Sequence, residues 1–222
     1  MDFSDIAQVM NNMIALIFAL SFHEAAHAFA AHVQGDKTAK MDGRLTLNPI
    51  PHIDPIGTIV FPLLGAIAGG AVIGWAKPVP VDVRNLRNQK WGYVLVAAAG
   101  PLSNLLLCFI SIFLLRGYEN YGTHTISPEH FLYPLVELLT PLIFINAILA
   151  IFNLLPLFPL DGGTVFTAFL PYNLKGMYDQ YIAPYGMFIL LALFFTNSLS
   201  WMGRIALGYI HFADAVVQRI FT

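Results

Sequence analysis

Charged residues are scarce in this chain of 222 residues. Lys, Arg, Asp and Glu together make up 11% of it, whereas about a quarter is usual in soluble domains. So few charges cannot cover the surface of a folded body of this size, which excludes an ordinary soluble globule. The formal net charge of −2 also gives no electrostatic reason to expect a nucleic-acid partner.

Cysteine is almost absent as well. Cys108 is the single cysteine, which excludes an internal disulfide and a metal site built from cysteines. Its apolar neighbours indicate a buried, unreactive thiol.

Apolar residues are abundant instead. They make up 57% of the chain, and the mean hydropathy is +0.67. Because a spanning helix needs about 20 mostly apolar residues, we expect an all-α polytopic membrane protein that forms one transmembrane domain over residues 1–222. Five to six transmembrane helices are predicted, since the last apolar stretch could also continue the fifth. The candidate stretches are residues 6–33, 55–76, 91–115, 138–160, 180–203 and 205–221.

The distribution of basic residues predicts the orientation in the membrane. Most Lys and Arg residues lie in the loops 34–54 and 77–90, whereas the loop 117–133 carries only acidic charges. By the positive-inside rule, the two basic loops are cytoplasmic and the acidic loop is not. Both flanks of residues 55–76 would then lie on one side. We therefore expect this stretch, rich in Pro and Gly, to be a re-entrant segment covered by protein.

An HExxH pattern lies inside the first apolar stretch. Four residues turn a helix by about 400°, so His23 and His27 share a face and can hold one zinc ion. Glu24 lies about 100° around the helix, where it suits a general base better than a metal ligand. Ionisable groups about 12 Å inside the end of a membrane helix are costly and usually mark a function. A chance match with two solvated histidines is the alternative.

A catalytic zinc needs a third protein ligand. Asp161 follows the fourth apolar stretch on the side expected for the two histidines, and the neighbouring glycines would let the backbone approach closely. Asp161 could also simply cap a short helix over residues 162–170, and the two roles are compatible. Glu137 lies too near the opposite membrane face. The remaining candidates are Asp214, His52 and Asp54. His52 and Asp54 could instead support the ligands or gate access.

Two asparagines in apolar surroundings also need partners. Asn104 lies within the stretch 91–115 and Asn153 near the end of 138–160. An amide in hydrocarbon is expected to form hydrogen bonds between helices. Alternatively, one of the two donates a hydrogen bond to an oxyanion that develops during a reaction, or contacts the substrate.

Jointly, these motifs resemble the site-2 protease family of intramembrane zinc metalloproteases, in its compact prokaryotic branch without a PDZ domain. The resemblance covers most of the chain and implies zinc held by His23, His27 and Asp161, with Glu24 as the general base. It also implies a core of the first, third and fourth apolar helices. The segments that carry it are residues 23–27, 43–55, 74–81, 99–104 and 153–163.

The expected function is hydrolysis of a peptide bond within or near a transmembrane segment of a membrane-protein substrate, as in regulated intramembrane proteolysis. The expected partners are that substrate and the lipid bilayer, and the expected location is the plasma membrane with the active site toward the cytoplasm. The alternative is a zinc-binding membrane protein without proteolytic activity. A metal transporter is disfavoured because residues 91–115 and 180–203 carry no carboxylate or histidine. Intact Glu24 disfavours a silent relative of the protease.

The alternating prolines in the segment 76–83 indicate how a substrate could be held. Pro78 and Pro80 remove N–H donors from one edge of an extended strand, whereas Lys77, Val79 and Val81 keep theirs on the other edge. We expect a short β-strand or hairpin near the active site that pairs with an extended substrate. A stiff extended loop fits the proline pattern equally well.

Overall fold

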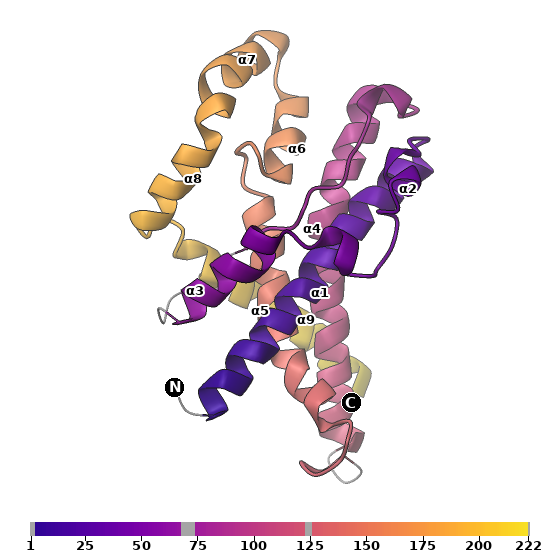
Figure 1. Ribbon diagram of the computed structural model, residues 1–222, viewed down its shortest axis with the longest axis vertical. Coiled ribbons are helices and arrows are strands. Elements are labelled where there is room, and N and C mark those ends of the chain that lie inside the picture. Colours follow the sequence, from indigo (N-terminus) through magenta and orange to yellow (C-terminus); the bar gives the residue numbers. More distant parts are fainter. Residues whose placement is uncertain (1–2, 68–73, 123–125, 222) are drawn as a thin grey trace.

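The computed structural model describes residues 3–67, 74–122 and 126–221. Three long helices, α1 (Phe3–Val33), α4 (Gln89–Gly117) and α5 (Tyr133–Asn153), pack against one another in its centre (Figure 1). In the described ranges, three helices are long and apolar enough to cross a membrane: Ile6–Val33, Gln89–Tyr121 and Tyr133–Asn153. This core agrees with the one that the sequence motifs imply.

Small residues on α1 let its neighbours approach closely. Ala15, Ala19, Ala28 and Ala31 are all 0% exposed. Small side chains are typical of helix interfaces in membranes, where backbones pack closely and polar groups form bonds between helices. The close approach matters for function because α1 carries the HExxH pattern.

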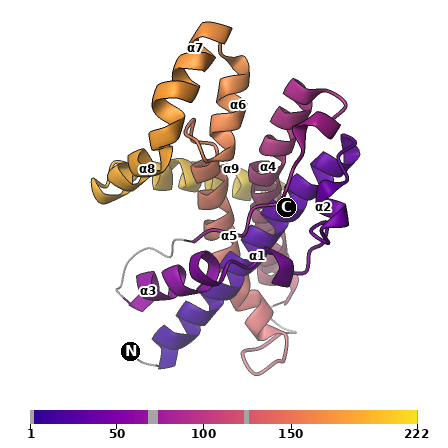
Figure 2. The ribbon, with the colours of Figure 1, turned by 45° about the horizontal axis from the view of Figure 1, so that its top comes forward.

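Shorter helices surround this core. In both views α7 and α8 lie on the far side of α6 from α1 (Figure 2). The last helix, α9, packs on α4 and α5, and Arg116 on α4 donates two hydrogen bonds to Asp214 on α9 at 2.6 and 2.7 Å. The shorter elements are α2 (Thr38–Met41), η1 (Ile50–His52), η2 (Pro55–Val60), α3 (Phe61–Ile67), η3 (Val83–Asn85), η4 (Tyr118–Gly122), α6 (Asp161–Phe169), α7 (Tyr172–Met177), η5 (Tyr178–Ile182), η6 (Ala183–Tyr185), α8 (Gly186–Phe195) and α9 (Trp201–Phe221).

The predicted β-strand or hairpin is wrong. No strand occurs in the part of the chain that the structure describes, and residues 75–82 are extended without a partner strand. The N–H of Lys77 instead donates to the carbonyl of His52 at 2.9 Å, and the N–H of Val79 donates to the Glu24 carboxylate at 2.8 Å. The stiff extended loop is therefore the better description of this segment.

The prediction of five to six transmembrane helices also exceeds what the structure contains. Residues 180–203 are interrupted by the turns η5 and η6, so α8 has only 10 residues, about half of a span. A turn that contains Asn197, with φ of 55°, then separates α8 from α9. Although α9 has 21 residues, it is not among the helices that are apolar enough to cross a membrane.

The predicted re-entrant segment, residues 55–76, falls partly on residues 68–73, which lie outside the described residues. The described portion, η2 and α3, is too short to cross a bilayer and contacts α1. Asp54 caps η2, because its Oδ1 accepts hydrogen bonds from the N–H groups of Ile56 and Gly57 at 3.0 and 2.7 Å.

The two basic loops meet at one end of the core. Asp36, which is fully buried, accepts hydrogen bonds from Thr38, from the N–H of Asp82 at 2.8 Å and from Asn85 at 3.2 Å. The N–H of Arg87 donates to the carbonyl of Gln34 at 2.8 Å. These bonds hold the loops 34–54 and 77–90 together.

Asp36 should make this junction sensitive to acid. Burial opposes ionisation of its carboxyl group, but the hydrogen bonds from Thr38, Asp82 and Asn85 outweigh burial and lower its pKa. The stabilisation is therefore present above the pKa of the unfolded chain and lost as pH falls through the lower pKa of the folded protein. Asp36→Asn should destabilise the protein by about 1–3 kcal/mol at neutral pH, measured by thermal unfolding in detergent. Asp42→Asn, at an exposed neighbour, is the control, and equal unfolding temperatures for both variants would contradict this role.

Candidate metal centre

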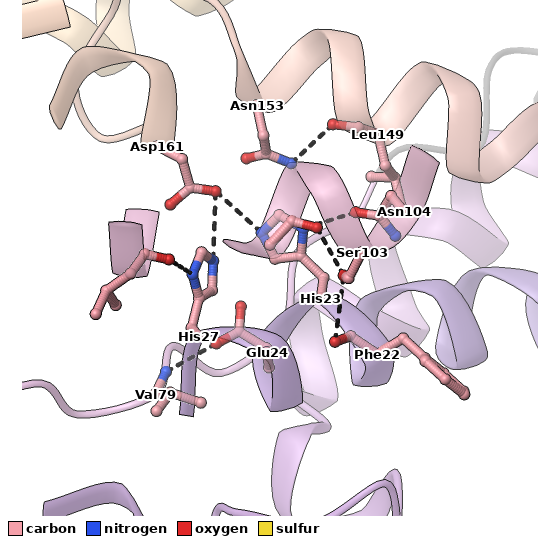
Figure 3. A network of polar contacts seen from close by, with 12 residues as sticks. Phe22, His23, Glu24, His27, Val79, Ser103, Asn104, Leu149, Asn153 and Asp161 are labelled. Carbon is pink, nitrogen blue, oxygen red and sulfur yellow. Dashed lines mark hydrogen bonds and ion pairs between the residues drawn. The ribbon is translucent and has the colours of Figure 1, made fainter. Parts of the chain in front are cut away.

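The two histidines of the HExxH pattern lie one turn apart on α1. His23 is 5% exposed, His27 is 9% exposed, and their ring centroids are 4.6 Å apart. Asp161 is the first residue of α6. Its Oδ2 atom lies 3.1 Å from Nε2 of His23 and 3.4 Å from Nε2 of His27 (Figure 3). The structure thus brings together all three side chains that the sequence analysis put forward as ligands.

The hydrogen bonds of the other ring nitrogens test whether a metal ion fits between these groups. Nδ1 of His27 lies 2.7 Å from the carbonyl oxygen of Val96, which can only accept, so Nδ1 carries the hydrogen and Nε2 presents a lone pair. Oδ2 of Asp161 is buried and makes no hydrogen bond within the described part of the chain. An acceptor without a donor beside imidazole lone pairs is repulsive unless a positive charge, on a protonated imidazole or on a metal ion, lies between the two groups. Two imidazoles and a carboxylate are a common ligand set for catalytic zinc.

Two glycines let the surrounding backbone approach this site. A Cβ atom on Gly100 of α4 would lie 2.4 Å from Nε2 of His27 and 2.6 Å from Cε1 of His23. A Cβ atom on Gly162 would lie 2.3 Å from the carbonyl oxygen of Leu154. The absence of a side chain at Gly100 therefore leaves space for the histidine rings. Gly162 lets the first turn of α6 pack against the backbone that follows α5. The role of Gly162 agrees with the close backbone approach expected of the glycines beside Asp161. The role of Gly100 could not be predicted from the sequence, because its approach to the histidines is a property of tertiary packing.

Glu24 lies beside the three ligand atoms without joining them. Its Oε2 accepts a hydrogen bond of 2.8 Å from the N–H of Val79 (Figure 3). The extended segment thus holds the carboxylate next to the histidines. Pairing of Lys77, Val79 and Val81 with a substrate stays a prediction, although the N–H groups of Lys77 and Val79 already have partners in the chain.

Asn104 and Asn153 differ in whether they have an amide hydrogen available for a hydrogen bond to an oxyanion. Asn104 is 0% exposed, and its amide nitrogen donates to the carbonyl of Ala19 at 3.0 Å and to Oδ1 of Asn146 at 2.7 Å. Both amide hydrogens are thereby used, so Asn104 has none for an oxyanion. Asn153 donates one hydrogen to the carbonyl of Leu149 at 3.0 Å (Figure 3). Its second amide hydrogen has no acceptor among the described residues, so Asn153 stays the candidate.

The other candidate ligands lie outside the group of converging atoms. His52 is 1% exposed, and its Nε2 lies 2.9 Å from the carbonyl oxygen of Thr46. Its backbone oxygen accepts from Lys77. His52 therefore supports the segment that reaches Glu24, whereas Asp54 and Asp214 have the capping and ion-pair roles described above. Glu137 is exposed on α5.

Comparison with known proteins identifies the family. The model of peptidase family M50 matches residues 12–195. YwhC of Bacillus subtilis (strain 168), which is named a zinc metalloprotease, is 41% identical over 184 residues, or 83% of this chain and 80% of YwhC. Rip2 of Mycolicibacterium smegmatis, named likewise, is 27% identical over 202 residues, or 89% of this chain and 71% of Rip2. No solved structure gives a significant match.

These matches confirm the resemblance that the motifs carry. The family model covers most of the chain, including most of the apolar helix Ile6–Val33 and all of the apolar helices Gln89–Tyr121 and Tyr133–Asn153. The chain is accordingly a membrane-embedded protein and belongs to peptidase family M50, the site-2 protease family of metalloproteases.

Proposed function

We propose that this protein is an intramembrane zinc endopeptidase, which hydrolyses a peptide bond within or near a transmembrane segment of another membrane protein. One observation carries the proposal. A buried carboxylate oxygen, Oδ2 of Asp161, has no hydrogen-bond donor within the described residues and lies 3.1 and 3.4 Å from Nε2 of His23 and His27. A divalent cation would satisfy all three atoms.

His23, His27 and Asp161 would hold the zinc ion. When bound, zinc supplies a Lewis acid that activates water and polarises the scissile carbonyl group. Three protein ligands leave one coordination position for the reaction. The carbonyl of Val96 orients the ring of His27 through Nδ1, and the amide of Asn104 lies at Nδ1 of His23 at 2.7 Å. Such outer partners fix the direction in which a ligand nitrogen points.

Glu24 would move the proton. Its carboxylate accepts a proton from the attacking water and returns it to the nitrogen of the leaving amine. The N–H of Val79 holds one oxygen of Glu24, so the other oxygen is free to take the proton. The free amide hydrogen of Asn153 suits a contact with the carbonyl oxygen of the substrate, where negative charge develops.

The position of the site fits a substrate in the bilayer that is cut near one membrane face. His23 precedes Val33, the last residue of α1, by about 15 Å of helix axis. That end of α1 carries the basic loops 34–54 and 77–90. We therefore propose that the site faces the cytoplasm and receives water from that side, by the positive-inside rule.

Substrate cleavage can be tested without knowing the substrate. N-terminal proteomics of membranes from cells that produce either the wild-type protein or Glu24→Gln should detect new protein N-termini inside or beside apolar spans in the wild-type cells only. The expected ratio is at least about a hundredfold, the lower range for general-base catalysis. Identical sets of N-termini, from cells in which the wild-type protein holds zinc, would reject the protease function and favour a zinc-binding protein.

A further inference from the structure

A chain of buried amides connects α5, α4 and the zinc ligand His23 on α1. Asn146 and Asn104 are both 0% exposed. The amide nitrogen of Asn146 lies 2.8 Å from the carbonyl oxygen of Leu142, and Oδ1 of Asn146 lies 2.7 Å from the amide nitrogen of Asn104. Oδ1 of Asn104 then lies 2.7 Å from Nδ1 of His23.

The ends of this chain determine the direction of every hydrogen bond in it. A backbone carbonyl can only accept, so the group of Asn146 that faces Leu142 must be its NH₂ group. The oxygen of Asn146 therefore faces Asn104. The NH₂ group of Asn104 lies between two acceptors, this oxygen and the carbonyl of Ala19 at 3.0 Å. Turning either amide over would bring oxygen against oxygen.

The direction of the chain fixes the tautomer of His23. Oδ1 of Asn104 faces Nδ1 of His23 and can only accept, so Nδ1 carries the ring hydrogen. Nε2 is then left with a lone pair directed toward Asp161, as a metal ligand requires. If Asn104 turned over, its NH₂ group would face Nδ1 and the ring hydrogen would move to Nε2, where it would block the metal ion.

We propose that Asn146 is a positioning residue for metal binding: from α5, through Asn104, it holds His23 in the Nδ1–H tautomer. The proposal rests on the zinc site of the proposed function, which does not itself require Asn146. The residue touches none of the three ligands. It is nevertheless the only group besides Ala19, within the described residues, that accepts a hydrogen bond from the amide nitrogen of Asn104.

Zinc affinity, measured by competition with a chelator on the full-length protein in detergent, tests the role of Asn146. Asn146→Leu removes the acceptor at similar size and should weaken zinc binding by about tenfold to a hundredfold, as is usual for outer partners of a ligand. Ser111→Ala is the matched control, because Ser111 is also buried and donates to the carbonyl of Leu107 at 2.8 Å without a link to His23.

Zinc affinity of folded Asn146→Leu equal to that of the wild-type protein would overturn the proposal, as would an equal loss in Ser111→Ala. Nitrogen-15 NMR of the metal-free wild-type protein gives a second test, which does not depend on how the variants fold. His23, assigned with His23→Gln, should show a protonated Nδ1, and a ring with its hydrogen on Nε2 and none on Nδ1 would overturn the proposal. If the wild-type protein bound no zinc, the proposed function would be rejected. The tautomer of His23 seen by NMR would still show whether the chain of amides orients its ring.

Discussion

Glu24→Gln is expected to lower the rate of peptide-bond cleavage by about 10² to 10⁴, the contribution of a positioned general base. Gln has nearly the same shape as Glu but cannot take a proton from water. Its amide oxygen can still accept the hydrogen bond from Val79, which is 2.8 Å in the structure. The variant should therefore keep its fold and its zinc. The rate is measured with the wild-type protein and the variant reconstituted in vesicles with a library of transmembrane peptides.

Glu137→Gln is the matched control for this experiment. Glu137 is also a carboxylate on a membrane helix, but it lies exposed near the start of α5, away from the three ligands. This substitution should leave cleavage and zinc content unchanged. If Glu24→Gln lost its zinc but still cleaved the peptides, Glu24 would be a metal ligand and not the general base.

Gly100→Ala is expected to disrupt the metal centre although it changes no ligand. The added methyl group would lie 2.4 Å from Nε2 of His27 and 2.6 Å from Cε1 of His23, distances at which the rings or the helix must shift. Metal geometry tolerates only small displacements of the ligands. Zinc affinity should fall by at least about tenfold to a hundredfold, and cleavage should fall with it. Chelator competition measures the affinity.

Gly117→Ala provides the control on the same helix. A Cβ atom there would lie 3.5 Å from the ring of Phe221, an ordinary contact, and Ala stabilises a helix by up to about 1 kcal/mol relative to Gly. Zinc affinity should be unchanged in this variant. A Gly100→Ala protein that bound zinc as tightly as Gly117→Ala would show that α4 does not approach the histidines as closely as the structure has it.

Local geometry explains which features the sequence predicts well. The side-by-side placement of His23 and His27 follows from helical rotation alone. Asp161 comes close because the chain turns shortly after α5, where prolines and glycines end regular structure. The three central helices are continuous apolar runs, and hydropathy identifies such runs directly.

Features that depend on interruptions or partners are predicted less well. Hydropathy joins residues 180–203 into one span, but Pro184 lies in the turn η6 and a second turn contains Asn197. Alternating prolines at 78 and 80 are compatible with a strand edge, but a strand also needs a second strand, and the described chain offers none there. Asn146 carries the same signal that singled out Asn104, an amide within an apolar span, and that signal alone would have identified it.

X-ray absorption at the zinc K edge, on purified protein with its metal content measured, can show whether His23, His27 and Asp161 hold one zinc ion. We expect about one zinc per chain, with two imidazole nitrogens and carboxylate or water oxygens at about 2.0–2.2 Å and no sulfur. Asp161→Ala should change this coordination and weaken zinc binding. A sulfur ligand, or an unchanged spectrum and occupancy in Asp161→Ala, would show that these three residues do not hold the metal.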